Sequence, residues 1–269
     1  MAVIDEIHEL QKIELKILLD VADFCKEHGI QFFLGEGTLL GAIRHHGFIP
    51  WDDDIDVLML REDYEKFLKI APGGLAGRYV VQHATTVKNY WSPFIKIRYQ
   101  ENHTRYHQQH IAHLSKDNGP LIDIFPLEYV KKPGGIKLRW QSFYIRYLRG
   151  MLSFRLGLRL PKNFRQKVLK IMAHFYTPEG LQKRLDRTFN MQRLRHGDYV
   201  AALSTYHELK CQIYPAAAFE KQKWVDFEGF SLPVPVGYDQ VLTAVYGDYM
   251  TPPPIDEQVI KHHFNEIDA

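Results

Sequence analysis

The acidic run Asp52–Asp56 contains four aspartates in five positions, and its second half opens an apolar stretch that continues to Met59. The stretch Asp54–Met59 has the length and composition of a buried strand. Side chains alternate in direction along a strand, so we expect Asp54 and Asp56 to share one face at about 7 Å while the apolar residues between them enter the core. The chain must therefore fold so that two carboxylates stand close together.

Two carboxylates at this spacing repel each other, and a divalent cation with oxygen ligands relieves that repulsion. The alternative is an acidic turn that caps the next helix. Capping suits Asp52 and Asp53, but it does not account for Asp54 and Asp56 inside an apolar strand. We therefore expect Asp54 and Asp56 to bind Mg²⁺ or Mn²⁺.

A third aspartate, Asp123, interrupts the apolar run Leu121–Phe125 in the same way. Taken alone, a buried aspartate serves equally well as a hydrogen-bonded structural group. Beside a metal-binding pair, Asp123 becomes a candidate third ligand or general base, so the sequence predicts a catalytic site containing all three carboxylates.

A glycine-rich turn precedes the acidic strand. The apolar run 30–34 is predicted to be a strand, and Gly35–Thr38 connects it to a helix that Thr38 caps and that ends near His45. Glycine permits close approach of a ligand, and a helix N-terminus presents N–H groups to an anion. Such turns often only connect elements, but this one stands sixteen residues before Asp54, so Gly37 and Thr38 are candidate substrate-binding residues.

The remaining pattern alternates helices with short strands, which indicates an α/β or α+β domain. The predicted helices cover 4–28, 61–70 with an end at the Pro72–Gly74 turn, 135–195 with breaks at Pro161 and Pro178, and 238–246. The predicted strands cover 78–82, 93–99, 121–125 and 224–230, the last followed by a turn at Pro233 and Pro235.

Charge divides the chain into two parts. Between Tyr129 and Pro178 there are twelve lysines and arginines and no acidic residue, although the net charge is only +2. We therefore predict a catalytic domain from residues 1–130 and 196–269 and a basic helical insertion at 131–195. The insertion is either a helical subdomain with a solvated basic face or an interfacial element that lies on an anionic membrane.

The start of the chain and the two cysteines say little about function. The start of the chain is acidic rather than basic, no apolar stretch reaches eighteen residues, and Cys25 and Cys211 have no metal-ligand spacing. Cys25 lies in an amphipathic helical pattern, which favours a buried free thiol in a reducing, cytoplasmic setting.

The chain resembles the LicD family of the nucleotidyltransferase-fold superfamily. The similarity rests on Gly37-Thr-Leu-Leu-Gly-Ala-Ile-Arg-His45, Gly47-Phe-Ile-Pro-Trp-Asp-Asp-Asp-Ile-Asp56, Arg61–Phe67, Lys96–Arg98, Asp123–Leu127 and the tail block Tyr246–Met250 with two prolines after it. It implies a mixed nucleotidyltransferase-like sheet flanked by helices. In that pattern Gly37 and Thr38 form the turn, and Asp54, Asp56 and Asp123 are the acidic ligands.

The resemblance also implies a reaction. Family members transfer a phospho-alcohol, typically phosphocholine from CDP-choline, to a sugar hydroxyl of a bacterial surface glycan such as teichoic acid or lipooligosaccharide, and CMP leaves. Arg44, Lys96 and Arg98 are candidate phosphate-binding residues, with surface ion pairs as the alternative. A lipid-linked acceptor would bring the cytoplasmic protein to the inner face of the cell membrane.

Other functions fit parts of the sequence. A nucleotidyltransferase acting on RNA or on a small molecule would suit the fold and the basic insertion, but no nucleic-acid-binding motif is recognised and nucleic acid is not an expected partner. A different CDP-alcohol, carrying ribitol or glycerol, would use the same site. A non-catalytic glycan-binding protein would leave the acidic residues unexplained.

Overall fold

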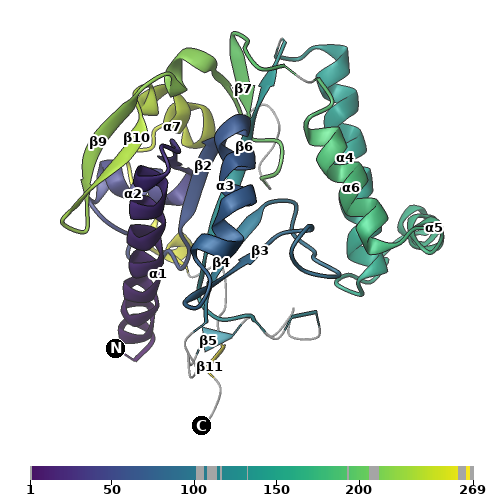
Figure 1. Cartoon of the computed structure of the whole chain (residues 1–269), viewed down its shortest axis with the longest axis horizontal. Coiled ribbons are helices and arrows are strands. Elements are labelled where there is room, and N and C mark those ends of the chain that lie inside the picture. The colour runs from purple at the N-terminus through teal and green to yellow at the C-terminus, as the bar shows by residue number, and fades with distance from the viewer. Residues whose placement is uncertain are drawn as a thin grey trace.

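A mixed sheet forms the centre of the computed structural model, which describes residues 2–100, 106–107, 114–115, 117–131, 133–192, 194–205, 212–259 and 265–266 (Figure 1). Its main strands run in the order β1 (Phe33–Leu34), β2 (Asp56–Leu60), β6 (Leu121–Val130), β4 (Ile95–Tyr99) and β3 (Tyr79–Gln82). The strands β7 (Tyr199–Ala201) and β8 (Ile213–Pro215) extend the sheet from the far half of β6. The neighbours β2 and β6 are parallel, and the other pairs are antiparallel.

Helices pack on this sheet because each carries an apolar stripe at helical spacing. They are α1 (Ala2–Glu27), α2 (Glu36–Arg44), α3 (Arg61–Gly74) and α7 (Tyr238–Tyr246). In α1, Ile17, Leu18 and Val21 are completely buried, and they join the strand residues in one continuous core. The mixed α/β architecture expected from the sequence is confirmed.

Three helices lie between β6 and β7 in the chain: α4 (Ile136–Arg155), α5 (Phe164–Ala173) and α6 (Pro178–Phe189). Asn163 caps α5 by accepting a hydrogen bond from the Gln166 N–H, and Thr177 caps α6 in the same way. Residues of α4 and α6 form a second cluster of buried side chains with the end of β6. Figure 1 shows these helices at the opposite end of the molecule from the hairpin of β9 (Gln222–Phe227) and β10 (Phe230–Pro235).

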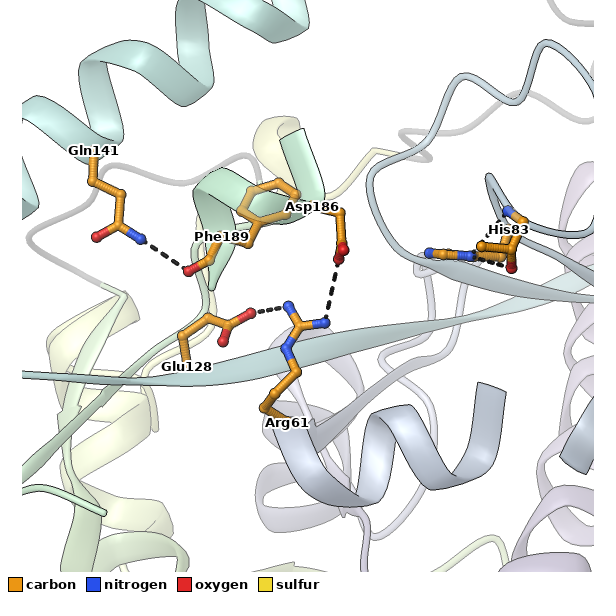
Figure 2. Close-up of polar contacts among 7 residues, drawn as sticks. Arg61, His83, Glu128, Gln141, Asp186 and Phe189 are labelled. Atoms are coloured by element: carbon orange, nitrogen blue, oxygen red, sulfur yellow. Dashed lines mark hydrogen bonds and ion pairs between the residues drawn. The ribbon is translucent and has the colours of Figure 1, made fainter. Parts of the chain in front are cut away.

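Polar contacts through Arg61 join this helical segment, residues 131–195, to α3 and the sheet (Figure 2). Arg61 at the start of α3 pairs with the buried carboxylate of Glu128 on β6, and its Nη1 lies 3.5 Å from Asp186 Oδ1 on α6. His83 lies near this junction, and burial lowers its pKa from 6.5 to about 4. The helical segment is thus held to the sheet by charged groups as well as by apolar packing.

Three expectations about element boundaries were wrong. The helix α3 continues through Pro72 to Gly74 instead of ending before them, and the last helix of the helical segment ends at Phe189 rather than near Arg195. The predicted turn at Pro233 and Pro235 is part of β10. The chain turns instead at Glu228 and Gly229, whose φ values of 53° and 81° suit a two-residue hairpin.

Smaller features complete the fold. A short antiparallel pair joins β5 (Tyr106–His107) to β11 (Asn265–Glu266), and 3₁₀ turns cover Ala216–Phe219 and Ile255–Glu257. Cys25 is a buried free thiol, as its helical context predicted, whereas Cys211 lies outside the described residues. Among the helices described, none is long and apolar enough to cross a membrane.

Candidate active site

Strand register brings Asp56, Asp123 and Lys96 side by side. Asp56 on β2 is directly opposite Asp123 on β6, and Asp123 is directly opposite Lys96 on β4. Residues directly opposite each other in a sheet project to the same face. One row across three strands therefore carries two carboxylates and one ammonium group, and all three side chains are nearly buried.

Lys96 holds Asp123 in a fixed orientation. Its Nζ donates to both carboxylate oxygens of Asp123, at 2.6 Å and 2.7 Å. Charge-assisted hydrogen bonds of this length are among the stronger polar contacts in proteins. From its sequence Lys96 was a candidate phosphate-binding residue, and in this structure its ammonium group lies on the third carboxylate.

The first turn of α2 is fastened to the acidic strand. The hydroxyl of Thr38 accepts a hydrogen bond of 2.8 Å from the Asp56 N–H, which fixes the first residue of β2. Thr38 does not cap the helix, because α2 begins at Glu36 and Gly35 occupies the capping position. Gly37 makes the close approach possible, since a Cβ there would lie 2.5 Å from Asp52 Oδ2.

The position of Asp54 differs in detail from the expectation. The strand β2 begins at Asp56, so Asp54 lies in the segment just before it and its side chain is half-buried. The two aspartates nevertheless interact electrostatically. Burial, followed by repulsion from Asp54 and then Asp123, raises the pKa of Asp56 well above its ordinary value.

Two buried carboxyl groups near the acidic strand were not among the predicted site residues. Glu36, with a φ of 46°, lies beside the acidic strand, and burial raises its pKa to about 7. Glu14 on α1 is completely buried, and within the described part of the chain neither of its carboxylate oxygens has a hydrogen-bond partner. Burial and repulsion from Asp54 and its neighbours raise the pKa of Glu14 well above the usual range.

Gln11, one turn before Glu14 on α1, was missed as well. Its Nε2 donates to the carbonyl oxygens of Asp52 at 2.8 Å and Ile49 at 3.4 Å, so α1 clamps the loop that leads into the acidic strand. The sequence did contain a signal for both residues. Gln11 and Glu14 occupy positions on the apolar stripe of α1, and polar residues are rarely buried there without a role.

The two candidate arginines bond to groups outside the carboxylate row. Arg98 shares a sheet face with Lys96 but is completely buried, where its guanidinium donates to Gln82 Oε1 and to the Gly119 carbonyl. Arg44, at the end of α2, is half-buried and donates to the carbonyl of Tyr249 at 2.9 Å. The observed contacts of both arginines are with protein groups.

The carboxylates provide a chemically suitable cation site. Hard divalent cations prefer carboxylate oxygens, and the repulsion that raises the pKa of Asp56 is the charge that such a cation neutralises. Among the residues the structure describes, no three His, Cys, Asp or Glu side chains are already spaced to hold a metal ion. Both carboxylate oxygens of Asp123 are bonded to Lys96.

A glycine turn fastened to an acidic strand, with a third aspartate on the adjacent parallel strand, is the arrangement that the resemblance to the nucleotidyltransferase-fold superfamily implies. Residues 29–144 match the LicD/FKTN/FKRP nucleotidyltransferase domain. The chain is 33% identical over 271 residues to the lipopolysaccharide cholinephosphotransferase LicD of Haemophilus influenzae, with 97% of each chain covered. The chain therefore belongs to the LicD family, which confirms the resemblance seen in the sequence.

A more distant relative shares only part of the chain. The ribitol 5-phosphate transferase FKRP of the mouse is 35% identical over 75 residues, which cover 28% of this chain and 15% of that protein. The bacterial similarity is thus nearly full-length and the animal similarity is local. The chain is a homologue of a cholinephosphotransferase over nearly its whole length.

Proposed function

We propose that this protein transfers phosphocholine from CDP-choline to a sugar hydroxyl of a bacterial surface glycan, such as lipooligosaccharide or teichoic acid, and releases CMP. The observation that carries the proposal is the similarity of 33% over 97% of both chains to a lipopolysaccharide cholinephosphotransferase. The carboxylate row of Asp56 and Asp123 supports it, because carboxylates can hold a divalent cation, and such a cation would stabilise the negative charge of the transferred phosphate.

Asp54, Asp56 and Asp123 are the residues that would hold Mg²⁺ or Mn²⁺. When bound, such a cation would neutralise charge on the pyrophosphate oxygens of the donor and on the departing CMP. Asp56 suits this role because Thr38 fixes its backbone and its carboxylate is repelled by its neighbours. Metal dependence is thus part of the proposal.

Asp123 is also the candidate general base. A base must reach the acceptor hydroxyl with a carboxylate oxygen, yet Lys96 now covers both oxygens of Asp123. We propose that Lys96 releases one of them when the donor arrives, because the donor phosphates offer the ammonium group a competing anion. Lys96 would then serve as the phosphate-binding residue that the sequence predicted.

Two further parts of the proposal concern the acceptor and its location. A lipid-linked glycan would meet a water-soluble CDP-alcohol at the inner face of the cell membrane, so we place the protein in the cytoplasm with access to that surface. The local similarity to a ribitol 5-phosphate transferase supports a second candidate donor, CDP-ribitol. No observation favours nucleic acid as a partner.

A donor comparison tests the proposal. Purified protein is incubated with Mg²⁺, a crude lipid-linked glycan fraction and one of CDP-choline, CDP-ribitol or CDP-glycerol, and CMP release is measured. We expect acceptor-dependent release from CDP-choline, with loss of release when EDTA removes the metal. Preferential use of CDP-ribitol would replace the donor but keep the chemistry, and absence of release from all three would reject the proposal.

A further inference from the structure

The helix α5 presents an apolar stripe to solvent. Phe164, Val168 and Ile171, with Phe175 just after the helix, recur at the spacing of one helix face, and they are between 40% and 83% exposed. Large apolar side chains are often exposed singly, but four along one face make an amphipathic helix with its apolar side outward. Figure 1 shows α5 at the outer edge of the molecule, beyond α4 and α6.

The opposite face of α5 already has its partner. Ala173 is buried, and Leu169 packs so closely on α4 that a Cβ at Gly150 would lie 3.0 Å from its Cδ2. Tyr147 of α4 also donates to the sulfur of Met172 at 3.4 Å. The helix is therefore docked by its short inner face, and the outward stripe is not needed to hold it in place.

The start of α4 repeats the pattern. Ile136, Trp140 and Phe143 follow one another at helical spacing and are between 54% and 73% exposed. They line a hollow of about 710 Å³ together with Arg139 and Arg146. Aromatic side chains beside arginines are typical of surfaces that meet the boundary between lipid headgroups and acyl chains.

Exposed cations flank the α5 stripe. Lys162, Arg165, Lys167 and Lys170 are all exposed, and the sequence between Tyr129 and Pro178 contains no acidic residue. Basic residues near an anionic membrane each increase the partition coefficient about fivefold. The surface therefore combines an apolar stripe with a one-sign positive border.

We infer that the outer face of α5, with the start of α4, docks on an anionic lipid bilayer: the apolar stripe enters the headgroup region and the flanking cations contact lipid phosphates. A second copy of the chain is a poorer occupant, because a symmetric contact would place two positive borders against each other. Nucleic acid would match the charge, but it would leave the exposed apolar stripe without a role. The inference depends on this surface and does not depend on which group the enzyme transfers.

The structure also shows which basic residues of the helical segment already contact protein groups and are therefore poor positions for a test of membrane binding. Arg149 of α4 is half-buried, and its Nη1 donates to the Ser204 and Thr205 carbonyls at 3.3 Å and 2.8 Å. Arg155 donates to the Tyr176 carbonyl. These arginines contact protein groups, so the cations around α5 are the better positions for a test of membrane binding.

The experiment measures sedimentation of the full-length protein with sucrose-loaded vesicles of phosphatidylcholine, with and without phosphatidylglycerol. We expect wild-type binding to anionic vesicles that weakens as salt rises. Phe164→Ser/Ile171→Ser/Phe175→Ser and Arg165→Gln/Lys167→Gln/Lys170→Gln should each reduce the partition coefficient at least about tenfold. Matched controls at other exposed positions, Ile255→Ser and Lys26→Gln/Lys69→Gln/Lys88→Gln, should bind as the wild type does.

Two further measurements on the same variants complete the test of the inference. Thermal unfolding of every variant should match the wild type, since the substituted side chains are exposed, and this shows that lost binding is not lost folding. CMP release in detergent solution should also be unchanged, which separates membrane docking from the proposed transfer. The inference would be overturned if the α5 variants bound vesicles as the wild type does, or if the wild type did not bind. A dimer that the apolar variant abolishes, or retention on tRNA with no vesicle binding, would also overturn it.

Discussion

The acidic end of the sheet and the basic surface of α5 differ in the burial of their charged groups. Asp56, Asp123 and Lys96 are nearly buried, and the burial and mutual repulsion of the acidic groups raise the pKa of Asp56. The cations flanking α5 are exposed and cost the fold little. Buried charge persists only where the surrounding structure imposes it, whereas exposed charge is available to a partner. In the proposals above, the first region performs the chemistry and the second attracts a partner.

The two regions also differ in how they are positioned. The acidic row is fixed by strand register and by the Thr38 hydroxyl, which accepts from the Asp56 N–H, and Gln11 holds the preceding loop at the Asp52 carbonyl. The α5 surface is positioned by one packed helix face and carries its features on the other. A substitution in the first region should therefore alter turnover or stability, and one in the second should alter association. Three predictions test this contrast.

The largest effect should follow loss of charge at Asp56. Asp56→Asn keeps the shape but removes a carboxylate, so turnover measured by CMP release should fall by about a hundredfold or more. Its folded-state pKa is raised, so ionised Asp56 destabilises the fold at neutral pH and the variant should unfold at an equal or higher urea concentration. The exposed control Asp256→Asn should keep wild-type turnover. Near wild-type activity in Asp56→Asn would remove the carboxylate from the mechanism.

A smaller effect, on stability, should follow loss of the Lys96 ammonium. Lys96→Met leaves Asp123 buried without its partner, and breaking a buried pair typically costs about 4 kcal/mol of unfolding free energy. The double variant Lys96→Met/Asp123→Asn should recover much of this loss, and a double-mutant cycle by urea denaturation measures the coupling.

The matched control for Lys96 is an exposed pair on α1. The side chains of Lys12 and Glu9 are 70% and 62% exposed. Lys12→Met should therefore have no measurable effect on unfolding. Comparable losses in Lys96→Met and Lys12→Met would contradict the distinction between buried and exposed charge drawn above.

The smallest effect concerns the pH dependence of stability at His83, near the junction between the sheet and the helical segment. His83 has a folded-state pKa of about 4 against an ordinary 6.5, so it must be neutral in the fold. Its contribution to stability is present above pH 6.5 and is lost as the pH falls toward about 4, by roughly 3 kcal/mol at most. His83→Asn should make unfolding less sensitive to acid over this window. The exposed control His174→Asn should leave the pH dependence unchanged, and equal slopes in all three proteins would refute the assignment.

Much of the fold could be predicted because local patterns decided it. The apolar stripe of α1 and the alternating strands around Asp56 and Asp123 are visible in the sequence, and these elements are present. The hairpin turn was misplaced because proline was read as a breaker. In this two-stranded pair Pro233 and Pro235 lie within β10, while Glu228 and Gly229 adopt the positive φ values of the turn.

The candidate site could be predicted only in part. Residue types identified Asp56 and Asp123, but partners depend on register, which the sequence does not display. The sequence therefore made Lys96 a candidate phosphate ligand, whereas in the structure it lies opposite Asp123. Arg98 shares its face but is completely buried. The assignments of metal and substrate contacts to these residues remain predictions.

The clamp from Gln11 to the Asp52 carbonyl spans 41 positions of the chain. Contacts of such separation require loop closure before they stabilise anything, so they form late relative to local helix contacts. The acidic loop therefore depends on a helix that comes much earlier in the chain than the acidic motif itself. A shortened protein that began at the glycine turn would keep the whole motif and lose the hydrogen bond that holds the loop.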